Sequence, residues 1–164
     1  MKLDINKEKF EIFLKVAREF KKSFNVILIL YGSFGFSRAI GEFGKVNDID
    51  VLVPNNLIKE RWGELINFMQ SLGFKLKDEH EHEFIKNGEI IAFGKKEDLS
   101  ELAKINPDNL KTSKVGGVEF KELSAEQYLV CYQSMLRDEY RQEKRGTADK
   151  DKIKLIEEHL KNKQ

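Results

Sequence analysis

The chain has 164 residues, of which 40% are hydrophobic and 35% charged, so it can bury one core beneath a heavily charged surface. The formal net charge of +1 argues against binding nucleic acid by bulk electrostatic attraction. The single cysteine, Cys131, excludes an intramolecular disulfide, and its apolar neighbours predict a buried thiol rather than a nucleophile. The charged N-terminal segment is unlike a signal peptide and no apolar run is long enough for a membrane span, so we expect a cytoplasmic protein.

The first half of the chain shows alternating helix and strand patterns. Apolar residues recur at helical spacing in the first segment, whereas NVILILYG and DIDVLVP read as short buried strands. Ser33 is a favoured helix N-cap and Gly41 a favoured helix end. The predicted elements are a helix over 7–22, a strand over 25–32, a helix over 33–40, a strand over 48–54 and a helix over 57–72.

The second half contains a hairpin signal, Asn87-Gly88, between two strand-like runs. The predicted elements are strands over 74–78, 81–87 and 88–94, a helix over 97–105, an irregular loop over 106–117, a strand over 118–123, and helices over 124–142 and 148–162. This order predicts an α+β (α/β) fold with a mixed β-sheet flanked by helices. We expect a core over 1–123 with a C-terminal helical hairpin over 124–164 packed on it.

Two carboxylates open a strand that is otherwise apolar. Alternate strand residues share a face, so Asp48 and Asp50 point one way, about 7 Å apart, while Ile49, Val51 and Val53 point into the core. Two neighbouring carboxylates repel each other unless a cation lies between them. Mg²⁺ commonly uses one or two protein carboxylates together with substrate phosphates, so this pair predicts a magnesium site.

A Gly-Ser corner precedes this strand in the sequence. Gly32 and Ser33 lie where the first predicted strand turns into a helix. Glycine lets a phosphate approach the backbone closely, and a helix N-terminus offers unpaired N–H groups and a favourable dipole. The corner and the acidic strand together predict a site for a nucleoside triphosphate, although helix capping by Ser33 is an equally good interpretation of that residue.

These residues resemble the signature of the nucleotidyltransferase fold superfamily, the polymerase-β-like group, in which hG-[GS] is followed by Dh[DE]h (h, hydrophobic). The chain is most similar to small prokaryotic members related to the antibiotic nucleotidyltransferases and to the abortive-infection and toxin–antitoxin nucleotidyltransferases. The tail agrees, since VEFKELSAEQYLVCYQSMLR followed by ADKDKIKLI is similar to a strand, helix and Lys-Asp pair of that group. The resemblance covers roughly residues 25–155.

The resemblance implies transfer of a nucleoside monophosphate from an NTP to a hydroxyl group, with release of pyrophosphate. By this resemblance, Asp48 and Asp50 would hold two Mg²⁺ ions, and Gly32 and Ser33 would hold the triphosphate. Family members usually add a third carboxylate from a later strand. Glu89 is the acid on the expected strand, and Glu83, on the preceding strand, is the reserve candidate.

Basic residues give weaker signals. Arg38, in the helix after Ser33, either pairs with an acid or contacts phosphate, and Arg137 and Lys150, which matches the lysine of the Lys-Asp pair, are candidate triphosphate contacts. The acceptor is open: a small molecule, a protein or an RNA. The alternative function is a nucleotide- or partner-binding module with weak or no catalysis, such as the antitoxin of a toxin partner protein.

Overall fold

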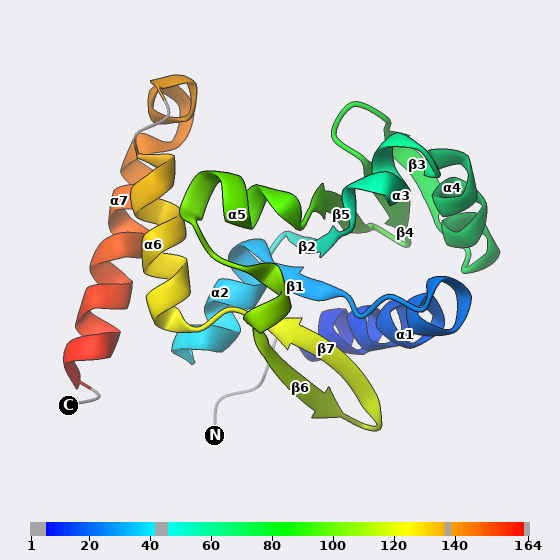
Figure 1. Ribbon diagram of the computed structural model, residues 1–164, viewed down its shortest axis with the longest axis horizontal. Coiled ribbons are helices and arrows are strands. Elements are labelled where there is room, and N and C mark those ends of the chain that lie inside the picture. Colours follow the sequence, from blue (N-terminus) through cyan, green and yellow to red (C-terminus); the bar gives the residue numbers. More distant parts are fainter. Residues whose placement is uncertain (1–5, 42–45, 137–138, 163–164) are drawn as a thin grey trace.

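The computed structural model describes residues 6–41, 46–136 and 139–162, and for 139–149 it describes the backbone alone. Seven strands form one mixed sheet in the order β3-β4-β5-β2-β1-β7-β6 (Figure 1). The strands are β1 (Ile29–Tyr31), β2 (Asp48–Val53), β3 (Lys75–Asp78), β4 (Glu83–Lys86), β5 (Glu89–Lys95), β6 (Lys111–Val115) and β7 (Val118–Glu122). The helices are α1 (Lys7–Phe24), α2 (Gly32–Ile40), α3 (Asn55–Lys59), α4 (Trp62–Ser71), α5 (Glu97–Ala103), η1 (Pro107–Asn109), α6 (Ala125–Met135) and α7 (Glu139–Asn162).

The centre of the sheet combines parallel and antiparallel pairs. β1 is antiparallel to β2 and parallel to β7, and β2 is parallel to β5. Two hairpins, β4–β5 and β6–β7, extend the sheet on either side. The first turns at Asn87-Gly88, both with positive φ (50° and 80°), as the hairpin signal predicts. The predicted fold class, a mixed sheet flanked by helices, is confirmed.

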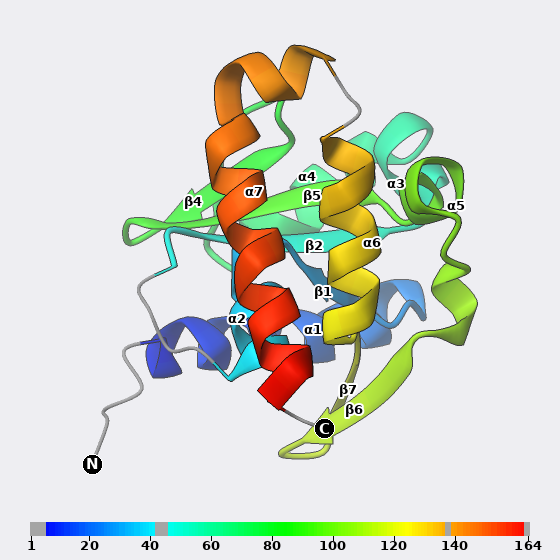
Figure 2. The ribbon, with the colours of Figure 1, turned by 90° about the vertical axis from the view of Figure 1, so that its left-hand side faces the viewer.

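Each face of the sheet carries its own apolar core. One face, with Leu30, Ile49 and Val51 at its centre, packs against the apolar sides of α1, α3 and α4. The other, with Ile29 and Leu52, packs against α5 and α6 and is reached by Ile156 of α7. Figure 2 shows α6 and α7 side by side in front of the sheet. The acidic face of β2 therefore looks toward α5, α6 and α7.

Several element predictions were wrong in detail. The segment 57–72 forms two helices, because Arg61 leaves helical dihedral angles (φ −117°, ψ 27°) between them. The segment 106–117 contains η1 and the edge strand β6, whose polar sequence KTSKV has no apolar alternation. Among the described strands, β6 pairs with β7 alone. The predicted helix over 124–142 is also wrong in its bounds, because α6 ends at Met135 and α7 begins at Glu139. α7 then runs unbroken through Gly146, where a break was expected, since α7 packs along α6 and a mid-helix glycine costs only about 1 kcal/mol. No helix in the described ranges is both long and apolar enough to cross a membrane.

Candidate functional site

A cleft of about 440 Å³ opens on the sheet face that carries α5, α6 and α7. Its floor comes from the β1–α2 corner, β2 and β5, and its walls from α5 and α6. Glu81 and Glu83 border it on the β4 side, and Lys152 of α7 reaches into it. The cleft thus brings together segments that lie far apart in the sequence.

Asp50 lies directly against the backbone of the Gly-Ser corner. β1 and β2 pair with Tyr31 opposite Asp50, which places the end of β1 beside the carboxylate. Gly32 has φ +64°, and a Cβ built on it would lie 2.1 Å from Oδ2 of Asp50. Only glycine fits this position without displacing the carboxylate. Asp50, Gly32 and Ser33 therefore face one cleft, as the sequence predicts.

Ser33 does not cap the helix. α2 begins one residue earlier than predicted, at Gly32, and Tyr31 occupies the N-cap position without a side-chain cap bond. The Ser33 Oγ instead accepts a hydrogen bond from Nζ of Lys152 at 3.2 Å. The same ammonium group lies 5.0 Å from the ring centroid of Tyr132, within cation–π distance. Ser33 and Lys152 thus form a polar pair on the cleft wall.

Asp48 lies two residues before Asp50 on the same face of β2. It is half-buried and pairs in parallel register with Ile90, just beyond the residues that line the cleft. Alternation leaves the two carboxylates about 7 Å apart along the strand. No group of three or more His, Cys, Asp or Glu side chains arranged to hold a metal occurs in the described part of the chain. The donor set suits Mg²⁺, which takes one or two carboxylates and completes its shell with water and phosphate oxygens.

The structure corrects the placement of Glu89. Parallel register pairs Asp48 with Ile90 and Asp50 with Ala92, so Glu89, by alternation, points to the opposite face of the sheet. There it pairs with Nζ of Lys9, a buried lysine that also donates to the backbone oxygen of Asn47. Glu89 neutralises a buried cation of α1 and stands apart from the two aspartates.

Glu83, the reserve candidate, lies on the cleft side. It pairs with Ala92 on β5, which itself pairs with Asp50 on β2, so Asp50, Ala92 and Glu83 form one row across three strands. Two strand spacings separate the Cα atoms of Asp50 and Glu83 by roughly 10 Å. The small Ala92 side chain stands between them. The Glu83 carboxylate lies 3.5 Å from Nζ of Lys77.

The candidate cationic residues lie in different surroundings. Nε of Arg38 donates to Glu122 at 2.7 Å and its guanidinium stacks on Phe10, so Arg38 pairs with an acid rather than lining the cleft. Lys150 is exposed, outside the cleft lining, and Lys152 takes the cleft position two residues later. Arg137 lies outside the described residues. Sequence analysis missed Lys152 because only the rotation of α7 distinguishes the two lysines.

The cleft is acidic overall. Among the described residues that line it, four carry carboxylates (Asp50, Glu81, Glu83 and Asp98) and Lys152 alone carries an amine. Partial burial raises the pKa of Asp98. Cys131 also lines the cleft, and burial raises the pKa of its thiol to about 11, partly offset by a hydrogen bond with Tyr31. The thiol is therefore protonated at neutral pH, consistent with the predicted inert cysteine.

Solved structures place this architecture in a known class. The chain is similar to the crystal structure of ANT(2'')-Ia in complex with adenylyl-2''-tobramycin, with a TM-score of 0.58 and 16% identity over 93% of this chain and 90% of that one. The solution structure of the antibiotic-resistance factor ANT(2'')-Ia gives a TM-score of 0.57 and 15% identity, over 96% and 86% of the two chains. The protein has a nucleotidyltransferase-like fold.

A sequence relative shows which family the chain belongs to. The chain is 34% identical to the uncharacterized protein YnaI of Bacillus subtilis (strain 168) over 150 residues, which cover 92% of this chain and 96% of YnaI. The protein belongs to the YnaI family. No protein-family model matches the sequence.

Proposed function

We propose that the protein catalyses Mg²⁺-dependent transfer of a nucleoside monophosphate from an NTP to a hydroxyl group of an acceptor, with release of pyrophosphate. The observation that carries this proposal is the packing of the Asp50 carboxylate against the backbone of Gly32, beside Ser33 and Lys152. A carboxylate, a glycine corner at a helix N-terminus and an amine in one cleft are the groups that a metal-bound triphosphate requires.

Each residue has a separate role in this proposal. Asp48 and Asp50 hold two Mg²⁺ ions. When bound, these ions neutralise phosphate charge and position the attacking and leaving oxygens. The first N–H groups of α2 and the Ser33 hydroxyl bind phosphate oxygens. Lys152, which lies within hydrogen-bond distance of Ser33, neutralises the charge that develops on pyrophosphate.

Glu83 is the carboxylate best placed to act on the acceptor. It shares a row with Asp50, and the small Ala92 between them leaves its side chain space to lean over β5. A carboxylate at this position can accept the proton of the attacking hydroxyl. In this assignment Glu83, from β4, takes the role that the family resemblance gives to a carboxylate of the expected strand.

The charge of the cleft favours a cationic small molecule as acceptor. Glu81, Glu83 and Asp98 all line the cleft and, among its described lining residues, outnumber Lys152, so they would repel a polyanion such as RNA. The ANT(2'')-Ia complex named above contains an adenylylated tobramycin. An amine-bearing molecule with a free hydroxyl is therefore the first class of acceptor to test.

Calorimetric titration with ATP, GTP, CTP and UTP in the presence of Mg²⁺ tests the site. We expect one NTP to bind the wild-type protein, and Asp50→Asn and Asp48→Asn to abolish the Mg²⁺-dependent part of its affinity. Lys152→Met should weaken triphosphate binding by at least tenfold, whereas Lys150→Met, an equal charge change two residues away on the same helix, should leave it unchanged. Equal binding by wild type and Asp50→Asn would refute the assignment.

A binding module with weak or no catalysis is the second candidate, and one observation favours it. The residues of β5 that share the face of Asp50 are Ile90, Ala92 and Gly94, so β5 contributes no carboxylate to the cleft. Pyrophosphate release measured with the bound NTP and a panel of hydroxylated amines separates the two functions. Mg²⁺-dependent binding without pyrophosphate release from any acceptor would support the binding module, with a toxin protein as a possible partner.

A further inference from the structure

A second concave site lies on the same face of the sheet, at the opposite end of β1 from the cleft. It is a pocket of about 240 Å³ between the end of α1, the start of β1, the segment after β5 and the η1 turn. Lys21, Lys96 and Lys121 line it together with the carboxylate of Asp108. We call it the basic pocket.

The lysines of the basic pocket come from α1, from the segment between β5 and α5, and from β7, and they outnumber the carboxylates of the described lining. Nζ of Lys96 lies 3.4 Å from Oδ1 of Asp108, and Nζ of Lys121 lies 3.4 Å from the Asp108 backbone oxygen. Nζ of Lys21 donates to the amide oxygen of Asn25 at 2.9 Å. The described pocket lining thus holds three cations and one anion.

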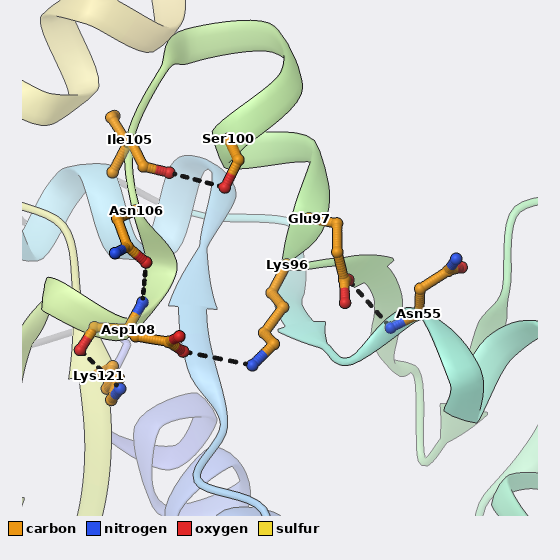
Figure 3. Close-up of polar contacts among 8 residues, drawn as sticks. All are labelled: Asn55, Lys96, Glu97, Ser100, Ile105, Asn106, Asp108 and Lys121. Carbon is orange, nitrogen blue, oxygen red and sulfur yellow. Dashed lines mark hydrogen bonds and ion pairs between the residues drawn. The ribbon is translucent and has the colours of Figure 1, made fainter.

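Glu97, the acid next to Lys96 in the sequence, bonds to a residue outside the pocket lining. Figure 3 shows Lys96 directed at Asp108, while Glu97, the next residue, accepts a hydrogen bond of 3.0 Å from the backbone N–H of Asn55 at the start of α3. The Asp108 side chain is 72% exposed, and its contact with Lys96 is long for a charge-assisted bond, which measures about 2.7–2.9 Å. An anion entering the pocket can therefore replace weak contacts with stronger ones.

The floor of the pocket is apolar. Val26, Ile27, Ile29, Leu52, Pro54 and Pro107 form it. An apolar floor beneath a cationic rim fits a ligand with one charged end and one hydrophobic end. The volume lies below the usual range of drug-sized sites, about 300–1,000 Å³, which limits the ligand to a small molecule.

We propose that the basic pocket binds a small phosphate monoester, with the phosphate held by Lys96, Lys121 and Lys21 and the organic group resting on the apolar floor. A dianion matches the excess of two positive charges, and lysine binds phosphate as a point charge without requiring bidentate geometry. The charged residues of the basic pocket do not line the triphosphate cleft, and the two linings share the apolar Leu52. The proposal does not depend on the proposed function.

Phenyl phosphate, with inorganic phosphate for comparison, is the probe. Titrated into the ¹⁵N-labelled wild-type protein, phenyl phosphate should saturate a single site, shift the amide signals of Lys96, Lys121 and Asn25, and bind more tightly than inorganic phosphate. Lys96→Gln/Lys121→Gln should weaken its binding by at least tenfold. Lys59→Gln/Lys75→Gln, an equal loss of charge at exposed positions outside the pocket, should not weaken it.

Two further variants complete the test. Asp108→Asn removes the competing carboxylate from an exposed position, so it should tighten phenyl phosphate binding severalfold without affecting the fold. Asp50→Asn should leave phenyl phosphate binding unchanged. A failure of the triphosphate site can therefore be distinguished from a failure of the basic pocket. The proposal is overturned if phenyl phosphate does not saturate, if both double variants weaken it equally, or if Asp108→Asn weakens it.

Discussion

Replacement of Gly32 by alanine tests the geometry of the cleft directly. The added Cβ would lie 2.1 Å from Oδ2 of Asp50, whereas contacts under 3.0 Å are essentially never seen for real Cβ atoms. The carboxylate and the start of α2 must therefore separate by about 1 Å, and misplacement of a reacting group by that amount can lower a rate by about 100-fold. The positive φ of Gly32 adds a backbone cost of about 1–2 kcal/mol for a residue with a Cβ.

Gly41 offers a matched control at the other end of the same helix. Its φ is +72°, and apart from the glycine and its chain neighbours no described residue has an atom within 4 Å of a Cβ built there. Gly41→Ala therefore carries the backbone cost without the clash with Asp50. Gly41→Ala should lose about 1–2 kcal/mol of unfolding free energy, measured by denaturant titration, and Gly32→Ala at least as much, because it carries the clash as well.

Only Gly32→Ala should also lose function. We expect Mg²⁺-dependent NTP affinity, measured by calorimetry, and pyrophosphate release to fall by about 100-fold in Gly32→Ala and to remain near wild type in Gly41→Ala. If Gly32→Ala binds NTP as tightly as Gly41→Ala, the Asp50 carboxylate does not face the Gly-Ser corner, and the proposed site is incorrect.

Three further predictions concern the core and the carboxylates. Burial raises the pKa of the Cys131 thiol to about 11, from 9.0 in the unfolded chain, so between pH 9 and 11 the unfolded chain loses this proton more readily than the folded protein. The free energy of unfolding of the wild type should therefore fall relative to that of Cys131→Ala as pH rises from 9 to 11. Parallel pH profiles of the two proteins from urea unfolding would contradict this. Gly35→Ala would put a Cβ 2.1 Å from the Tyr128 hydroxyl, a buried group with no hydrogen-bond partner among the described residues, so the variant should lower the melting temperature. Tyr128→Phe should cost nothing alone and restore part of that loss in the double variant, and no restoration would refute the contact. Glu89→Gln should cost about 1.5–3 kcal/mol of unfolding free energy, because it leaves the buried Lys9 without a carboxylate, and should change the transfer rate per folded molecule little. Glu83→Gln should instead lower that rate at least tenfold with little change in stability. The reverse pattern would return the catalytic role to Glu89.

Local signals in the sequence were sufficient for much of the fold. The Asn87-Gly88 turn predicted its hairpin because both positions need positive φ, and this requirement belongs to the turn itself. The sequence placed the Gly-Ser corner at a helix start, because the frequency of glycine at turns depends on the local chain alone. It placed Asp48 and Asp50 on one strand face, because side-chain alternation is also a local property. β6 was missed because a polar edge strand has no such local signal and forms only by pairing with β7.

The residues that surround the two aspartates depended on tertiary structure. Alternation states which residues of a strand share a face, but the register with the neighbouring strand decides which face that is. The pairing of Asp50 with Ala92 turned Glu89 toward Lys9 and left Glu83 beside the cleft. Register is fixed by long-range packing, which one strand's sequence does not contain.

The same distinction applies to the lysines of α7. Successive helix residues are about 100° apart, so Lys150 and Lys152 point to nearly opposite sides, and the Lys-Asp motif alone does not say which side faces the sheet. Burial of Ile156 against the sheet face sets the rotation of α7 and brings Lys152 to Ser33. The sequence by itself determined the strand face of the acidic pair and the glycine corner, because these follow from local backbone geometry. The tertiary structure decided which third carboxylate and which cation accompany them, because these depend on how distant segments pack.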